Sequence, residues 1–252
     1  MKRESGFALL IVLWTLVLIS LLLTGLAASA RSDAQLTANL RSAAELEAEA
    51  DGAISTAIFA LLQPGKQSAA RDSATEVSSL SGLVNPNVVS PELLRALLFR
   101  LGTDPNRAEA LASAIVDWRS PSLGKQRNGA KAAEYRAAGL EYGPPGAPYE
   151  TLAELREVLG MTPGLFAALL PHVTLYWDED PEPQAASPLV RAAMRDAGLR
   201  RGPGQAGHDV VLITATASRP NGARVTRRAI IRLGRSGNQR LWRTLVWETA
   251  SV

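Results

Sequence analysis

The sequence contains no cysteine. This absence excludes disulfide bonds, thiol nucleophiles and cysteine-ligated metals from the chemistry of the chain. It is equally compatible with the cytoplasm and with the periplasm. The rest of the composition is that of a folded protein, because 46% of the 252 residues are hydrophobic and the formal net charge is only +3. The length is ample for a buried core in one or two domains.

Histidine is scarce as well. Only His172 and His208 are present, and neither stands in a metal-binding spacing such as HExxH. The sequence also lacks a glycine-rich phosphate loop, since GPPGAP at 143–148 is typical of a turn-forming linker. We therefore expect a protein that is not an enzyme, with no catalytic residue and no cofactor.

Ionisable side chains are absent from Phe7 to Ala30. With a rise of about 1.5 Å per residue, a helix over this run spans a hydrocarbon core of about 30 Å. The run is longer than the apolar region of a secretory signal, which is about 7–15 residues. Lys2 and Arg3 precede it, and this charge places the N-terminus in the cytoplasm. The sequence thus predicts a single-pass protein of a bacterial inner membrane, with most of the chain in the periplasm.

Helical periodicity continues beyond the apolar run. No proline interrupts the chain before Pro64, and apolar residues recur at helical spacing as far as Leu62. We predict one long helix over residues 7–63, with its membrane part at about 7–30. Its second half is amphipathic and is expected to turn its acidic side chains to solvent: Glu45, Glu47, Glu49 and Asp51.

A basic leader that ends in glycine before such a helix resembles the type IV pilins and pseudopilins. The resemblance implies that a prepilin peptidase removes residues 1–6 by cutting after Gly6, and that Phe7 becomes the N-methylated first residue. Glycine suits the cut, because a side chain would obstruct binding of extended backbone. The family normally carries a glutamate at the fifth mature position, where it pairs with the N-terminal ammonium of the adjoining subunit. Ile11 stands there instead, which suits a subunit at the fibre tip.

The middle of the chain, residues 80–175, is predicted to be an inserted α-helical domain. Leu80–Val84 could form a short strand at its start. Four helix starts then carry either an N-cap before a proline or a capping box: Ser90-Pro91, Asp104-Pro105, Thr151 with Glu154, and Thr162-Pro163.

The C-terminal part, residues 176–252, is predicted to complete an antiparallel sheet that packs against residues 40–62 of the long helix. Three segments have strand character: 208–218, 223–234 and 240–249. In the second, alternation points Val225, Ala229, Ile231 and Leu233 inward and Arg224, Arg228 and Arg232 outward. From Arg191 onward the chain contains twelve arginines and only three acidic residues. They indicate a solvated sheet face or a surface for an acidic partner, nucleic acid or lipid headgroups.

The ordered set of motifs in the middle block resembles the K-type minor pseudopilin of the type II secretion system. The motifs are VNPN at 84–87, AIVDW at 114–118, NGA at 128–130, the lone Tyr135, and ELREVLGMTP at 154–163. The resemblance implies an α+β, pilin-like fold and a non-enzymatic role at the pseudopilus tip, in protein secretion across the outer membrane. It also implies the partners: minor pseudopilins of the I and J types, the major pseudopilin and the prepilin peptidase. Small residues on the long helix would permit close contact with these partners or with the chain's own sheet: Ala43, Ala44, Ala48 and Ala50.

Calcium binding is common in the helical domain of this family, through acidic residues after the DW and GA pairs. Here Arg119-Ser120-Pro121-Ser122 follows DW, and Lys131-Ala132 follows GA. Only Asp117 and Glu134 remain as carboxylates, too few for an ion that takes six to eight oxygens. We expect no metal site. A second acidic cluster, Asp178-Glu179-Asp180, is expected to be a solvated linker.

Two alternative functions remain open. One is a minor pilin of a type IV pilus, which shares the anchor and the fold type. The other is a DNA-binding membrane protein, since residues 84–98 and 154–170 resemble helix-hairpin-helix units. Against DNA binding, Gly160-Met161-Thr162 has only the first glycine of such a hairpin, and Pro163 removes one amide donor.

Overall fold

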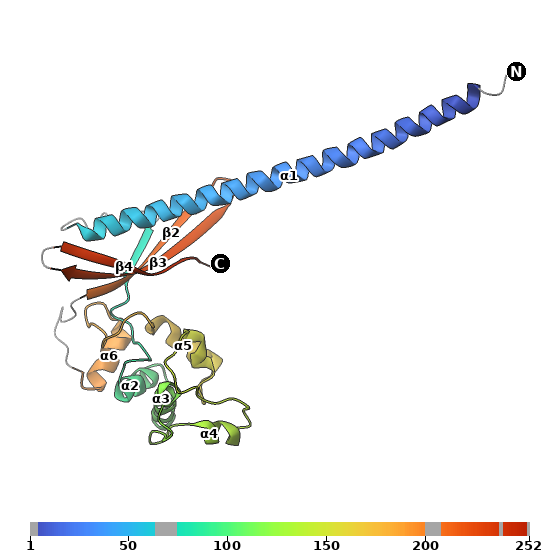
Figure 1. The fold of residues 1–252 in the computed structure, drawn as a ribbon. Helices are drawn as coiled ribbons and strands as arrows, with labels where there is room; N and C mark the ends of the chain where they lie inside the picture. The colour runs from blue at the N-terminus through green and yellow to red at the C-terminus, as the bar shows by residue number, and fades with distance from the viewer. Residues whose placement is uncertain (1–4, 64–74, 200–207, 237–238, 251–252) are drawn as a thin grey trace.

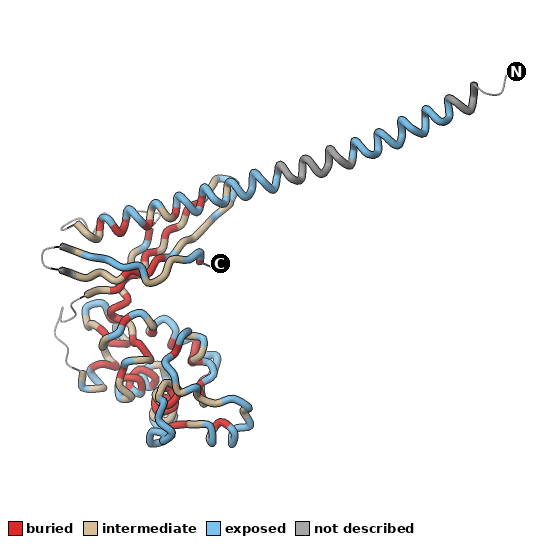
Figure 2. Tube along the Cα trace, viewed as in Figure 1, coloured by how far each residue is buried: buried red, intermediate tan, exposed pale blue. Residues whose placement is uncertain are grey.

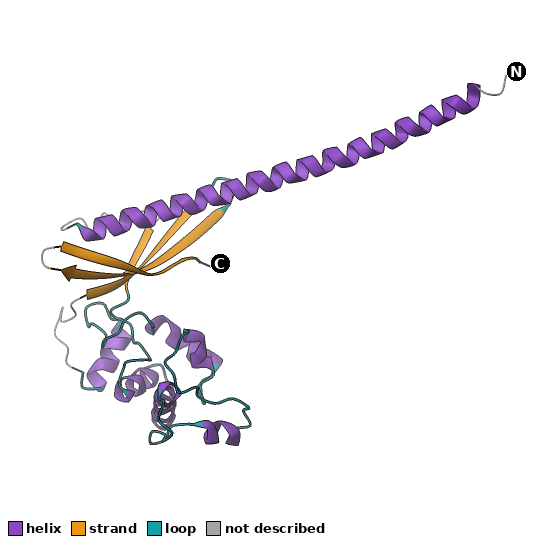
Figure 3. Cartoon of the chain, in the orientation of Figure 1, coloured by secondary structure: helices purple, strands orange, loops and turns teal. Residues whose placement is uncertain are grey.

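The computed structural model describes residues 5–63, 75–199, 208–236 and 239–250. The chain forms one long helix, a four-stranded antiparallel sheet and a separate group of short helices (Figures 1 and 3). The sheet lies between the C-terminal half of the long helix and the helical group. This arrangement is the α+β architecture expected from the sequence.

The long helix, α1, runs from Ser5 to Leu62 without a break, as the uninterrupted periodicity predicts. Its last turns lie across the sheet, and the rest projects beyond it (Figure 1). The side chains buried against the sheet recur every three or four positions, which is the spacing of one helical face: Leu46, Ala50, Ile54, Ala57 and Ile58.

Within the described residues, no helix is both long enough and apolar enough to cross a membrane.

The sheet has the strand order β1-β2-β3-β4, and every neighbouring pair is antiparallel. Its strands are β1 (Thr75–Ser79), β2 (His208–Ser218), β3 (Arg224–Ser236) and β4 (Gln239–Thr249). The last three agree with the predicted segments, and a register shift at Ile230/Ile231 marks a bulge between β3 and β4. The sequence predicts the inward side of β3 correctly, because Ala229 and Ile231 are fully buried against α1.

The prediction of a strand at Leu80–Val84 is wrong. The first strand ends at Ser79, and residues 80–83 form a turn in which the N–H of Leu83 donates to the carbonyl of Leu80 at 3.1 Å. Val84 makes only an isolated parallel bridge with Val173. Gly82 packs so closely on another segment that a Cβ there would lie 2.2 Å from the carbonyl carbon of Ala185. A turn that needs this close approach cannot continue a strand.

The helical block contains α2 (Pro91–Arg100), α3 (Pro105–Arg119), α4 (Ala132–Ala137), α5 (Pro163–Leu169) and α6 (Pro188–Asp196). Two 3₁₀ helices, η2 (Leu152–Arg156) and η3 (Leu170–His172), complete it. The predicted caps form: Ser90 accepts from the N–H of Leu93, and Asp104 accepts from the N–H groups of Asn106 and Arg107. The capping box of Thr151 starts a 3₁₀ helix instead of an α-helix.

One helix of this block, α6, is absent from the sequence prediction. Its N-cap Ser187 accepts from the N–H of Val190, and Pro188 occupies the first helical position. This is the same cap-plus-proline signal that marks α2 and α3. Val190 and Ala193 are fully buried in the core of the block, so the block extends past residue 175, the boundary expected from the sequence.

Two hydrophobic cores stabilise the chain, one inside the helical block and one between α1 and the sheet (Figure 2). A smaller cluster joins them on the other face of the sheet. It consists of Leu80 and Trp177 from the chain around the block and of Val210 and Ile230 from β2 and β3. Because the block lies between β1 and β2 in the sequence, it is an insertion in one connection of the sheet.

Candidate functional site

The predicted processing site lies at the free end of α1. Gly6 and Phe7 belong to its first turns, far from the sheet (Figure 1). Ile11 follows one turn later with 48% of its surface exposed. The structure places these residues on one continuous helix, while cleavage after Gly6 and methylation of Phe7 stay predictions.

A row of exposed apolar or small side chains runs along the middle of α1. Leu36 and Leu40 are 59% and 63% exposed, and Ala44 and Ala48 follow at intervals of four residues. Positions four apart form a ridge on a helix surface, and small residues allow a second helix to approach closely. Ala43 is exposed too, whereas Ala50 is buried against the sheet. Of the four alanines, only Ala50 is occupied by the chain's own sheet.

The expectation that the acidic residues of α1 face solvent is wrong for Asp51, which is partly buried and is bound by side chains of the sheet. Asp51 accepts hydrogen bonds from Arg227 Nε and Trp247 Nε1, each at 2.8 Å. Glu49 is exposed, as expected, and forms an ion pair with Arg219 at 2.8 Å. The spacing along α1 places these carboxylates at the border of the buried face, where they meet Arg227 of β3 and Arg219, which directly follows β2. Part of the C-terminal arginine excess is therefore neutralised within the chain.

The acidic cluster at 178–180 is exposed at Asp178, as expected of a solvated segment, but it is also tied to the sheet. Asp178 contacts His208 Nε2 and Arg232 Nη2, each at 3.0 Å, so it is tied to β2 and β3. Burial alone would raise its pKa, but Arg232 and His208 hold the pKa of this carboxyl below its usual range. The neighbouring Trp177 is fully buried and donates from Nε1 to the carbonyl of Asp180 at 3.0 Å.

The loop after α3 holds the residues considered for calcium. Asp117, near the end of α3, is fully buried, and both its carboxylate oxygens accept from the N–H of Gln126, at 2.9 and 3.1 Å. Gly129 packs directly on this carboxylate, since a Cβ there would lie 2.0 Å from Oδ2. Burial is the main cause that raises the pKa of Asp117.

Lys131 and Glu134 organise the other side of the same loop. Lys131 Nζ donates to the carbonyls of Asp117 and Ser120, each at 2.7 Å. Glu134 accepts from Lys125 Nζ and from the N–H of Lys131. The hydrogen bond from the Lys125 side chain is the largest cause that lowers the pKa of Glu134, to about 2.

These residues do not fit a calcium site. The two carboxylates are engaged by different donors, and an ammonium group already occupies the neighbouring carbonyls. In the described part of the chain, no group of three or more histidine, aspartate and glutamate side chains could hold a metal ion.

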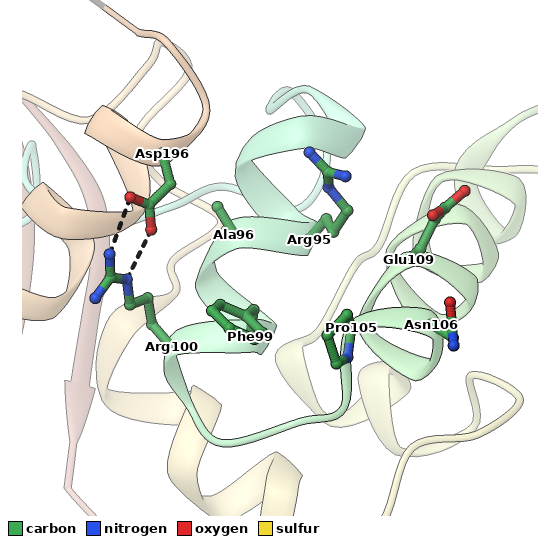
Figure 4. A pocket seen from close by; sticks show the side chains of 8 residues that line it. All are labelled: Arg95, Ala96, Phe99, Arg100, Pro105, Asn106, Glu109 and Asp196. Carbon is green, nitrogen blue, oxygen red and sulfur yellow. Dashed lines mark hydrogen bonds and ion pairs between the residues drawn. The ribbon is translucent and has the colours of Figure 1, made fainter.

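A shallow pocket of about 370 Å³ opens where α2, α3 and the end of α6 meet (Figure 4). Arg100 closes one side through a two-pronged ion pair with Asp196, at 2.7 and 2.9 Å. Arg95 and Glu109 lie on facing helices across it. The pocket contains no histidine, serine or threonine among its lining residues. Nothing in it is arranged as a nucleophile with a base.

The histidines and the hairpin segments have structural contacts. The Nδ1 of His172 lies 3.4 Å from Ser187 Oγ, the N-cap of α6, and burial lowers the pKa of this histidine. Arg107 donates to the carbonyl of Gly160 at 3.1 Å and so holds the second hairpin-like segment against α3.

The VNPN motif has a role that sequence reasoning missed. Asn85 is buried and donates from Nδ2 to the carbonyl of Trp177 at 2.7 Å. Asn87 makes a reciprocal pair with the backbone of Tyr149, at 2.9 and 2.8 Å. The two asparagines therefore hold the start of the block to the segment at Trp177 and to the chain at Tyr149.

Comparison with known proteins points to one family. Residues 75–178 match the family described as Type II secretion system (T2SS), protein K. The type II secretion system protein K of Klebsiella pneumoniae is 34% identical over 88 residues, which are 35% of this chain and 27% of that protein. The namesake from Pectobacterium carotovorum subsp. carotovorum is 33% identical over 82 residues, 32% of this chain and 25% of that protein. This chain therefore matches about a quarter of the length of these relatives.

The fold has a counterpart among solved structures. A chain of the GspK-GspI-GspJ complex from the enterotoxigenic Escherichia coli type 2 secretion system aligns with a TM-score of 0.64 and 18% sequence identity. The alignment covers 86% of this chain and 99% of that chain. At this identity the likeness establishes the fold. The resemblance to protein K that the sequence motifs indicate is confirmed for residues 75–178 by the family match.

Proposed function

We propose, from the match of residues 75–178 to the protein K family, that this chain is a minor pseudopilin of type II secretion at the tip of the pseudopilus. The main structural support for this proposal is the helical block, which is inserted between β1 and β2 of a sheet that packs on one long helix. The matched family is a secretion-system component and not a family of enzymes. The role is mechanical: the chain initiates or caps a fibre that serves protein secretion.

The stalk of this subunit is a membrane helix in our proposal, with the head in the periplasm. Residues 7–30 carry no ionisable side chain, and the large apolar side chains described in this run, from Leu9 to Leu23, are exposed. Apolar surface in water costs about 25 cal/mol per Å², so a bare helix of this kind needs lipid or a partner around it. An anchor in the inner membrane supplies the lipid.

Ile11 supports the position at the tip. The leader ends at Gly6, and a subunit within the fibre needs an acid at position 11 to pair with the N-terminus of its neighbour. An isoleucine cannot make this pair, and the tip is the place where the pair is not needed. The wide helical block agrees with this position, because it would hinder stacking inside a fibre but can crown one (Figure 1).

The partners we propose are minor pseudopilins of the I and J types, joined through α1. The similar fold comes from a GspK-GspI-GspJ complex. The exposed row at Leu36, Leu40, Ala44 and Ala48 gives a partner helix a surface for close packing. The same family match disfavours a type IV pilus subunit and a DNA-binding protein, because neither alternative requires a protein K domain at residues 75–178.

A reconstitution tests the proposal. Versions that lack residues 1–30 are co-expressed with I- and J-type subunits from the same genome and purified by size exclusion. We expect a ternary complex that survives at micromolar concentration. An Ala44→Glu variant should lose it, since a charge would enter the helix contact.

The matched control is Leu123→Glu, which adds the same charge at a residue that is 99% exposed in the loop after α3. This variant should assemble like the parent. Separate elution of the unaltered domains would contradict the proposed tip complex.

A further inference from the structure

We propose that the ammonium group of Lys131 takes the place of a divalent cation in the loop between α3 and α4. The helical block would then keep this loop folded without calcium. The inference concerns the folding of the block and does not depend on the proposed secretion function.

The first observation is the position of the ammonium group. Lys131 Nζ lies 2.7 Å from the carbonyl oxygen of Asp117 and 2.7 Å from that of Ser120. These carbonyls belong to the C-terminal end of α3, where unpaired carbonyls and the helix dipole attract positive charge. Backbone carbonyls are also ordinary ligands of calcium. The ammonium group of Lys131 therefore already binds the two carbonyl oxygens that a metal ion would use at the start of this loop.

The second observation is that the carboxylates point elsewhere. Asp117 accepts from the backbone of Gln126, and Gly129 lies against its Oδ2. Glu134 is held by Lys125 and by the N–H of Lys131. The two acids each have donors of their own and leave no pair of carboxylates directed at one ion.

The hydroxyl oxygens of the loop are also occupied by its own backbone. Ser120 Oγ accepts from the N–H of Ser122 at 3.3 Å, and Ser122 Oγ accepts from the N–H of Gly124 at 3.2 Å. These contacts fix the local turns. They do not direct oxygens toward the carbonyl pair that Lys131 binds.

The third observation is the charge of the segment. Residues 117–134 contain four cationic side chains and two carboxylates. A divalent ion would have to enter a segment that already has an excess of positive charge, which weakens its binding. The ammonium group of Lys131 brings a single positive charge and three hydrogen-bond donors. Two of these donors suffice for the two carbonyls, and one charge adds less repulsion than a divalent ion would.

Thermal unfolding of the full-length chain in detergent tests the proposal, with melting followed by circular dichroism in calcium and in EDTA. The melting temperature of the unaltered chain should differ by less than about 1 °C between the two buffers, because a ligand that does not bind the native state does not stabilise it. A clear rise in calcium, or calcium retained in equilibrium dialysis at millimolar concentration, would overturn the proposal.

Substitution of the lysine gives the second arm. Lys131→Met should lower the melting temperature by about 5–10 °C in both buffers, since two charge-assisted hydrogen bonds are lost. Lys131→Asp should melt early in EDTA and regain part of the loss in calcium, because it returns a carboxylate to the carbonyl pair.

Lys125→Met is the matched control. It removes one charge from the same loop, but from a side chain that is 47% exposed and does not contact the carbonyl pair. Its melting temperature should fall less than that of Lys131→Met. Equal losses in the two methionine variants, or a Lys131→Asp variant that ignores calcium, would contradict the assigned role of the ammonium group.

Discussion

At the scale of single residues, Glu134 makes the stability of the helical block depend on pH. Its pKa is lowered from 4.5 to about 2, first by the Lys125 side chain and then by the N–H of Lys131. A carboxyl with a lowered pKa in the folded state stabilises it above the unfolded pKa, and this contribution is lost as the pH falls from about 4.5 toward 2.

We therefore predict that Glu134→Gln flattens the acid side of the stability profile. Urea unfolding followed by tryptophan fluorescence should show the largest difference from the parent above pH 5 and a shrinking difference below pH 4. Lys125→Met should flatten the profile in the same window, because it removes the main partner. A difference that stays constant between pH 3 and 7 would contradict the assigned pKa.

At the scale of elements, the contact between α1 and the sheet depends on a polar border as well as on its apolar core. Asp51 binds Arg227 and Trp247, and the Arg227 side chain is only 17% exposed. Asp51→Ala would leave both donors unpaired, at a cost of about 1–3 kcal/mol in the free energy of unfolding.

Urea denaturation measures this loss. Glu47→Ala serves as the control, because Glu47 is exposed on the same helix and its loss should stay within about 0.5 kcal/mol. In the double variant with Arg227→Met, the two losses should be less than additive, since they remove the same contact. If the two losses in free energy of unfolding are fully additive, the Asp51–Arg227 pair does not stabilise the contact between α1 and the sheet.

Local signals predict the elements well and the contacts between them poorly. The caps at Ser90 and Asp104 specify where α2 and α3 begin, because a cap is formed by residues adjacent in the chain. The cap at Ser187 carries the same signal and would have predicted α6. The partners of Asp51 lie more than 170 residues away along the chain, so neither its spacing nor its neighbours could reveal that it faces arginines.

In the loop between α3 and α4, too, one feature can be predicted from the sequence and another cannot. The replacement of acidic residues after DW and GA predicts a poor calcium site from the sequence alone. The new role of Lys131 depends on how the loop turns back on α3, which no local pattern specifies.

At the scale of the whole molecule, Trp177 joins the helical block to the sheet. It is fully buried in the small cluster with Val210 and Ile230, and its ring centroid lies 5.0 Å from that of His208. Trp177→Ala should lower the free energy of unfolding by about 3–5 kcal/mol, as for other large buried side chains.

Because the two larger cores have no residue in common in the described part of the chain, we expect scanning calorimetry of this variant to show two separate transitions. Tyr176→Ala is the control, because this neighbour is 37% exposed. One sharp transition at the temperature of the parent would show that the cluster does not couple the two parts.

The proposed position at the fibre tip gives a prediction at the same scale. An Ile11→Glu variant restores the acid that an interior subunit carries, and we expect it to disturb tip assembly and reduce secretion in the native host. Ile11→Leu keeps the apolar character and should behave like the parent. If Ile11→Glu secretes and assembles normally, the apolar residue does not assign the tip.

The insertion between β1 and β2 has a consequence for redesign of the sheet and its connections. Ser79 pairs with Val211 across the two strands, and the N–H of Leu80 donates to the carbonyl of Val210 at 2.7 Å, so the chain leaves the sheet at the end of β1 and returns to it at the adjacent start of β2. A tight turn between these points would close a plain four-stranded meander on α1. We therefore expect the sheet to keep its strand pairing on α1 if the helical block is replaced by such a turn.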